Sequence, residues 1–243
     1  MSDTLKMETQ RIRTLTPVWL LALAAIAFGL IAATFVVLTP PRGTTLSAED
    51  TRAVLTGASS ISLLPFVGLP LIFLGVVAVS EDLQHQLATV LLVAQPRRSR
   101  LMAARLAVLT GLAIAVGLVQ ATLCATLSTA LGRSLQLGAI PGALVPQLIA
   151  LILFSWCGAA LGWLTGSAAI PVGLVLLEVL LLEPLARIAG AEYSDDLEHW
   201  SGNLPFAVAR DALTLDVHAV TFALGYAAVL LIAAWLTVRS RDY

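Results

Sequence analysis

The sequence predicts an all-α integral membrane protein with six transmembrane helices. Hydrophobic residues make up 58% of the chain and charged residues only 12%, and the mean hydropathy is +0.92. Charged residues are absent from five long stretches, and one helical crossing needs only about 20 apolar residues. These stretches are 14–41, 53–80, 106–132, 134–177 and 217–238. We therefore expect one membrane domain over residues 1–243.

The fourth uncharged stretch is long enough for two crossings. Gly166 and Ser167, followed by Pro171, predict where it divides, because glycine permits a turn and proline suits the first turn of a new helix. The six predicted spans are 17–38, 59–79, 101–131, 146–165, 168–188 and 217–238. An even number of crossings places both termini on the same side of the membrane.

The basic residues predict that this side is the cytoplasm. The larger group falls on the side of the termini and contains Lys6, Arg11, Arg13, Arg97, Arg98, Arg100, Arg105, Arg239 and Arg241. The smaller group falls on the opposite side and contains Arg42, Arg52, Arg133, Arg187 and Arg210. Lysine and arginine are enriched in cytoplasmic loops, so we expect cytoplasmic termini. The first span is too long for a cleavable signal peptide, and we expect it to be retained.

A polar, basic segment of helical pattern separates the second and third predicted spans. Its apolar residues recur at helical spacing from Leu83 to Ala94, which indicates an amphipathic helix over about residues 81–94. The candidate contact residues are Glu81, Asp82, Gln84, His85, Gln86 and Thr89 on its polar face, and then Pro96, Arg97 and Arg98. Such a helix is suited to bind a soluble partner. The arginines have a second interpretation, in which they contact anionic lipid.

Sequence motifs for nucleotide or metal binding are missing. A Walker loop ends in Gly-Lys-Ser/Thr, but the only lysine is Lys6, and no glycine is near it. Any ATP that drives this protein would therefore be hydrolysed by another polypeptide. Cys124 and Cys157 lie in apolar segments without the CxxC spacing, so they predict neither a disulfide framework nor a zinc site.

The order of these motifs resembles the permease subunit of ABC-2 type transporters. In that family a glutamate closes the second span, a coupling helix follows, and a Pro-x-Arg element leads to a basic residue in the third span. Glu81, Pro96-Arg97-Arg98 and Arg105 match this order. Leu204-Pro205-Phe206 resembles the end of the family's external re-entrant helical hairpin between spans five and six. The chain departs from the family at His85-Gln86, where many members have Gly-Thr.

The resemblance implies the permease subunit of an ATP-driven exporter in the cytoplasmic membrane of a bacterial cell. The implied cargo is hydrophobic or amphiphilic: a drug, a natural product, an antimicrobial peptide or a lipid. The implied partners are two ATPase subunits, a second permease subunit that is identical or related, and membrane lipid, with no nucleic acid. ATP and magnesium would bind to the ATPase subunits, and this chain would carry no cofactor.

Carboxylates in and beyond the fifth span are further candidate site residues. Glu178 lies near the middle of that span, where an ionised carboxyl costs about 2.5 to 3.5 kcal/mol. It either contacts substrate or a proton in a translocation path, or is a neutral carboxyl packed against another span. Glu183 and Arg187 are spaced i, i+4, which predicts an interfacial ion pair. The candidates for an external gate are Glu192, Asp195, Asp196, Glu198, Leu204, Pro205 and Phe206.

Three alternatives compete with these predictions. Ser167 and His218 could form the dyad of an intramembrane serine protease, but the predicted topology puts about 30 Å of bilayer between them. The acidic external segment, with His199, could bind a divalent cation, although its spacing follows no recognised site and a solvated loop explains it as well. A membrane anchor that transports nothing would leave the predicted coupling helix unexplained.

Overall fold

The fold is all-α, as predicted. The computed structural model describes residues 2–38, 45–56, 67–84, 98–193, 204 and 217–240. Its α-helices are α1 (Ser2–Thr14), α2 (Thr16–Leu38), α3 (Ala48–Thr56), α4 (Gly68–Gln84), α6 (Arg98–Ala130), α7 (Ile140–Thr165), α8 (Ala169–Leu177), α9 (Glu183–Tyr193) and α12 (Val217–Ser240). A 3-10 helix η1 (Leu137–Ala139) precedes α7, and a π-helix η2 (Glu178–Leu182) joins α8 to α9. The described residues contain no β-strand and one isolated bridge, between Thr45 and Ser134.

Among the residues that the structure describes, five helical segments are long and apolar enough to cross a membrane, so the chain is a multi-pass membrane protein. These segments are Thr16–Leu38, Ser99–Ala130, Leu137–Thr165, Ala169–Ala186 and Val220–Ser240, and they coincide with five of the predicted spans. The remaining predicted span, 59–79, corresponds to α4, whose apolar stretch Gly68–Glu81 is shorter. Residues 59–66 lie outside the described part of the chain.

The helix that contains the fourth predicted span begins before the predicted start at Pro146. Pro146 lies inside α7, which begins six residues earlier at Ile140 with Pro141 in its first turn. The first turn of a helix tolerates proline, because the backbone N–H groups there have no intrahelical partner.

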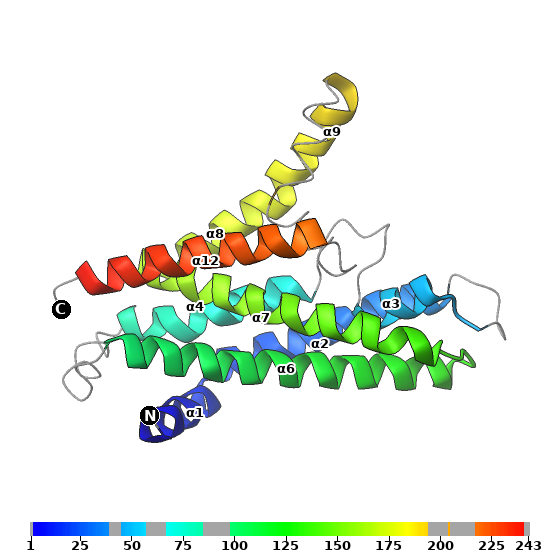
Figure 1. Cartoon of the computed structure of the whole chain (residues 1–243), viewed down its shortest axis with the longest axis horizontal. Helices are drawn as coiled ribbons and strands as arrows, with labels where there is room; N and C mark the ends of the chain where they lie inside the picture. The colour runs from blue at the N-terminus through cyan, green and yellow to red at the C-terminus, as the bar shows by residue number, and fades with distance from the viewer. Residues whose placement is uncertain are drawn as a thin grey trace.

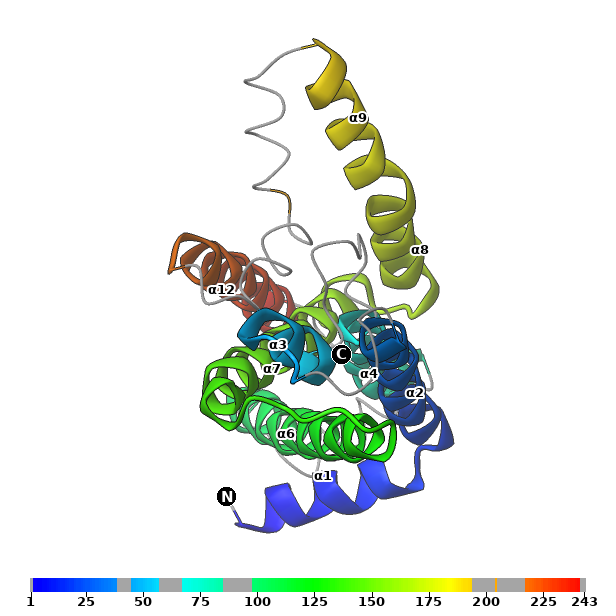
Figure 2. The ribbon, with the colours of Figure 1, turned by 90° about the vertical axis from the view of Figure 1, so that its right-hand side faces the viewer.

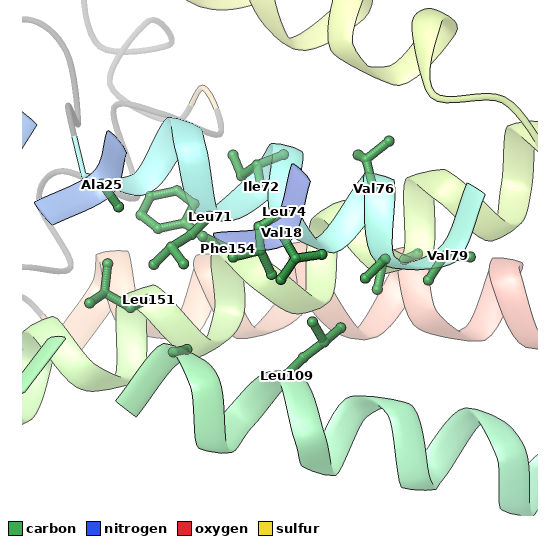
Figure 3. Close-up of a cluster of buried hydrophobic side chains, with 14 of the residues drawn as sticks. Val18, Ala25, Leu71, Ile72, Leu74, Val76, Val79, Leu109, Leu151 and Phe154 are labelled. Atoms are coloured by element: carbon green, nitrogen blue, oxygen red, sulfur yellow. The ribbon is translucent and has the colours of Figure 1, made fainter. Parts of the chain in front are cut away.

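The core forms where α2, α4, α6 and α7 run side by side along the long axis of the molecule, with α12 packed on α7 (Figure 1). Their facing side chains are mainly aliphatic, and Leu71, Leu74 and Leu109 are completely buried (Figure 3). Phe154 of α7 packs into the same cluster. The opposite faces of α2, α8 and α12 carry exposed large apolar residues, as expected of surfaces that contact lipid.

Glycines bring the backbones of α4 and α7 into direct contact. A Cβ atom added to Gly158 would collide with the carbonyl oxygen of Ile72, and one added to Gly75 would collide with the carbonyl oxygen of Ser155. Gly162, one turn further along α7, would place a Cβ 3.0 Å from the Val76 carbonyl oxygen. Small residues at such positions allow close van der Waals packing, which is the main source of helix association in a membrane.

The predicted division of the fourth uncharged stretch is confirmed. Gly166 ends α7 in the left-handed region, with a φ of 66°, and its N–H donates to the Gly162 carbonyl. The next helix, α8, begins at Ala169 with Pro171 in its first turn. It packs against α7 and α4, and α9 then leads away from the bundle (Figure 1).

The short helix α3 lies at one end of the bundle, which we call the α3 end (Figure 1). It packs against α2, α6 and α7 and sits among their ends when the bundle is viewed along its axis (Figure 2). Ser47 and Asp50 begin it with a reciprocal cap, in which the Asp50 N–H donates to the Ser47 hydroxyl at 3.0 Å. The sequence analysis did not predict this helix.

Nearby, Arg133 is buried and its Nη2 donates to the Val37 carbonyl at the end of α2, at 3.2 Å.

Candidate functional site

The N-terminal segment is a polar helix that lies across the end of the bundle opposite α3 (Figure 2). Residues at i, i+4 spacing give this helix one buried face. Thr4, Glu8 and Ile12 form this face and are almost completely buried, mainly against α6. Exposed residues, among them Lys6 and Arg13, cover the other side. α1 is therefore held by packing as well as by charge.

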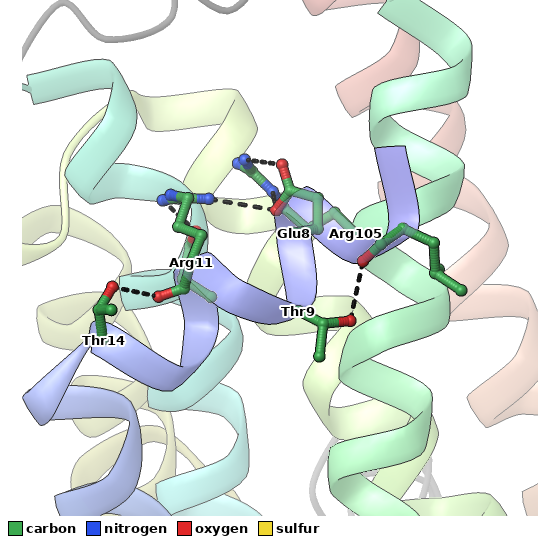
Figure 4. A network of polar contacts seen from close by, with 7 residues as sticks. Glu8, Thr9, Arg11, Thr14 and Arg105 are labelled. Carbon is green, nitrogen blue, oxygen red and sulfur yellow. Dashed lines mark hydrogen bonds and ion pairs between the residues drawn. The ribbon is translucent and has the colours of Figure 1, made fainter. Parts of the chain in front are cut away.

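Glu8 and Arg105 form a buried ion pair that ties α1 to α6 (Figure 4). The Glu8 Oε1 atom lies 3.0 Å from Arg105 Nη2, and the Oε2 atom lies 3.2 Å from Arg105 Nε. Both side chains are enclosed: 0% of Glu8 and 4% of Arg105 is exposed. Two parallel N–H···O bonds are the strongest geometry for such a pair, and they compensate for the removal of both charges from water.

Arg11 extends this contact to α4. Its Nη1 lies 3.3 Å from Glu8 Oε2, while its Nη2 donates to the Ala78 carbonyl at 3.2 Å. Ala78 lies in the last two turns of α4, and Arg105 lies in the first turns of α6. We call Glu8, Arg11, Arg105 and the Ala78 carbonyl the α1 junction. Through it, one helix outside the bundle holds the end of α4 and the beginning of α6.

The α1 junction adjoins the predicted coupling segment. Glu81, Asp82 and Gln84 lie in the last turns of α4, which is continuous from Gly68. The prediction that a separate helix starts at Glu81 was therefore wrong, because the helical pattern of α4 runs on without a break. Arg98 is the first residue of α6. The predicted contact residues His85, Gln86, Thr89, Pro96 and Arg97 lie outside the described part of the chain.

Glu178 is the first residue of the π-helical segment η2, between α8 and α9. Its side chain is partly exposed on a helix that leads away from the bundle. A π-helix widens the backbone locally, and such segments are often found at functional sites. Both interpretations of Glu178, a contact in a translocation path and a packed neutral carboxyl, stay open. Glu183, the first residue of α9, is buried, and its ion pair with Arg187 stays a prediction.

Most residues of the predicted external gate lie outside the described part of the chain. Glu192 belongs to the last turn of α9, and Leu204 is an isolated described position that is partly buried. Asp195, Asp196, Glu198, Pro205 and Phe206 are not among the described residues. The re-entrant hairpin and the choice between a gate, a solvated loop and a metal site therefore stay predictions.

The structure does not bring the two residues of the alternative protease dyad together. Ser167 lies in the turn between α7 and α8, at the end of the bundle where α12 finishes, whereas His218 is the second residue of α12. Figure 1 shows that α12 begins at the opposite end. The length of α12 alone implies a separation of about 30 Å, given a rise of about 1.5 Å per residue. A proton cannot pass directly between groups so far apart.

The sequence analysis did not find Glu8 or Arg11 as site residues. Their i, i+3 spacing, and the i, i+4 spacing of the buried face, were visible signals of an amphipathic helix. The partner of Glu8, however, lies almost a hundred residues away in the chain, and nothing local identifies it. Comparison of the sequence with known proteins gives no matching family model and no matching curated protein.

Proposed function

We propose that this chain is the permease subunit of an ATP-driven transporter of the ABC-2 type. In this proposal it crosses the cytoplasmic membrane of a bacterial cell six times, with α4 as the second span and both termini in the cytoplasm. Two ATPase subunits carry ATP and magnesium, and a second permease subunit, identical or related, completes the membrane part. The cargo is a hydrophobic or amphiphilic compound that is exported.

The α1 junction is the observation that supports the proposal most. An ATPase outside the membrane can drive transport only if its movement reaches several membrane helices at once. A force on residues 85–97 would act on the end of α4 and the beginning of α6, since this segment joins them. Because Glu8 holds Arg105 and Arg11 holds the Ala78 carbonyl, α1 would move with both helices.

A membrane anchor that transports nothing is the second candidate function. Such a protein needs apolar helices and an interfacial helix, and the chain has both. It does not need a polar helical segment between two spans, nor a buried ion pair where that segment meets the membrane. The two functions differ in their dependence on an ATPase, which can be measured.

The double substitution Glu81→Ala, His85→Ala tests the role of the polar segment. We expect transport by the complex of this chain and its ATPase to fall by about tenfold or more, because the contact that positions the moving parts is lost. Membrane insertion should be unchanged. Transport, ATPase activity and co-purification of the ATPase are measured together, with Glu49→Ala in α3 as the control at the other end of the bundle. Unchanged transport together with unchanged ATPase binding would refute the proposed contact.

The proposed orientation predicts which residues can be labelled from outside the cell. In a variant without Cys124 and Cys157, a cysteine at Ser194 should react with a membrane-impermeant thiol reagent added to intact cells. A cysteine at Ser99, an exposed residue at the beginning of α6, should react only after the cells are permeabilised. This expectation follows from the excess of basic residues on the proposed cytoplasmic side. Labelling of Ser99→Cys alone in intact cells would invert the topology.

A further inference from the structure

Two glutamines form a polar pair inside the helix bundle. Gln120 of α6 and Gln147 of α7 are both almost completely buried, and Gln147 Nε2 donates to Gln120 Oε1 at 3.1 Å. Gly29 of α2 makes room for the pair, since a Cβ there would collide with the Gln120 side chain. A carboxamide in apolar surroundings is costly unless its hydrogen bonds are made. This hydrogen bond uses the amino group of Gln147 and the carbonyl of Gln120.

The remaining amino group and the remaining carbonyl have no partner. Among the described residues, nothing bonds to Gln120 Nε2 or to Gln147 Oε1. Exchanging the nitrogen and oxygen of both amides would reverse the bond and still leave one donor and one acceptor unpaired. An unpaired buried group costs more free energy than a hydrogen bond contributes. Water that reaches the pair would supply both of the missing partners.

The short helix α3 packs close to this pair. Leu55 of α3 packs with Ala121 and Ala143, which lie one residue after Gln120 and one turn before Gln147. The preceding residue, Val54, packs in one cluster with Cys124, one turn from Gln120 on α6. The inner face of α3 thus closes the bundle over both the glutamines and a buried thiol.

Hydrogen bonds attach α3 and the residues just before it to the segment 134–136. The backbone N–H of Gln136 donates to the Thr51 hydroxyl at 3.2 Å, and the N–H of Leu46, just before α3, donates to the Ser134 carbonyl at 3.1 Å. The N-terminal cap of α3 joins Ser47 to Asp50, so these bonds do not attach the helix to the bundle. A helix of nine residues is marginal on its own, so its position depends on the apolar contacts of its buried face.

We propose that α3 is a lid over the Gln120–Gln147 pair. When α3 lifts, water reaches the unpaired amino group of Gln120 and the unpaired carbonyl of Gln147. The apolar contacts of Leu55 and Val54 favour the closed position. The unpaired amide groups favour the open position, because water supplies the missing donor and acceptor. The lid is a property of this chain alone, so it is independent of the proposed transport function.

Cys124 offers a native probe of the lid. The chain has two cysteines, so Cys157→Ser leaves Cys124 as the only thiol. Cys124 is completely buried beneath α3 and can meet a charged, water-soluble methanethiosulfonate only when water enters. The reaction rate is measured in permeabilised membrane vesicles without nucleotide or partner, so both membrane faces are accessible.

Weakening the lid should accelerate the reaction. We expect Leu55→Ala to raise the modification rate of Cys124 by about tenfold or more, since it removes buried contacts only from the closed position. Thr51→Val keeps the side-chain volume and removes the acceptor for the Gln136 N–H; it should raise the rate by a smaller factor. The matched control is Leu109→Ala, which truncates an equally buried leucine of α6 outside the α3 contacts. It should leave the rate within about twofold.

Removing the amide groups should slow the reaction. In the double variant Gln120→Met, Gln147→Met the open position loses its advantage, because apolar groups of similar size have no need of water. We expect the rate to fall by about tenfold relative to the Cys157→Ser protein. A faster reaction in this variant would show that the pair holds the helices together, which overturns the proposal. An equal acceleration by Leu109→Ala and Leu55→Ala would overturn it as well, because it indicates general loosening of the bundle.

Discussion

Replacement of Glu8 by leucine will lower the free energy of unfolding by about 3 to 5 kcal/mol. The substitution removes the Glu8 carboxylate that compensates the charge of Arg105, whose side chain is only 4% exposed. Arg11 loses one contact but keeps the Ala78 carbonyl, and 17% of its side chain is exposed. The effect therefore comes mainly from Arg105. Reversible unfolding of the purified chain in mixed micelles measures it.

The double variant Glu8→Leu, Arg105→Leu distinguishes the loss of the compensating carboxylate from simple loss of packing. Two apolar side chains can replace a buried ion pair at little cost, so the double variant should regain most of the lost stability. Arg100→Leu, which removes an exposed arginine of the same helix, should change stability by no more than about 0.5 kcal/mol. A double variant as unstable as Glu8→Leu alone would contradict this explanation.

Alanine at Gly158 will separate α4 from α7 and cost about 3 kcal/mol or more. The new methyl group would collide with the Ile72 carbonyl oxygen, and a backbone atom cannot move aside as the end of a side chain can. The whole helix must therefore shift, with loss of contacts along the core. Thermal unfolding, followed by helical circular dichroism in detergent, gives the change in stability.

Gly111 of α6 provides the matched control. A Cβ added there meets no atom within 4 Å, and alanine favours the helix more than glycine does. Gly111→Ala should therefore leave the stability unchanged or raise it by up to about 1 kcal/mol. If the two substitutions had similar effects, the close contact of α4 and α7 would not be a source of stability.

The apolar spans could be predicted because their cause is local. A run of apolar residues long enough to cross a bilayer must be helical to pair its own backbone groups, so hydropathy alone located α2, α6 and α12 within a few residues. The turn at Gly166 was equally local, since glycine tolerates the positive φ found there.

The two helices outside the apolar spans were not predicted, for two different reasons. The N-terminal cap of α3 is visible as Ser47 and Asp50, but the helix is short, and its apolar residues became informative only once their neighbours were known. For α1, the decisive contact joins Glu8 to Arg105, and no local pattern specifies a partner so far along the chain. Long-range pairing of this kind depends on the packing of the whole bundle.

The π-helical segment at Glu178 was also beyond the sequence analysis. The apolar pattern of 168–188 does not mark this turn, because residues 174–182 contain neither glycine nor proline, and Pro184 comes only after it. The role of Glu178 and those of the residues in 85–97 are still predictions, and the experiments above address the latter.

The interlocked glycines of α4 and α7 have a practical consequence for measuring motion in this protein. Two backbones that touch at successive turns can neither slide nor rotate past each other without a collision, so the pair behaves as a single rigid body. Spectroscopic labels placed on the two helices should keep a constant separation in every conformation. Their separation is an internal reference distance, and displacements of α1, α3 or α9 can be measured relative to it within the same molecule.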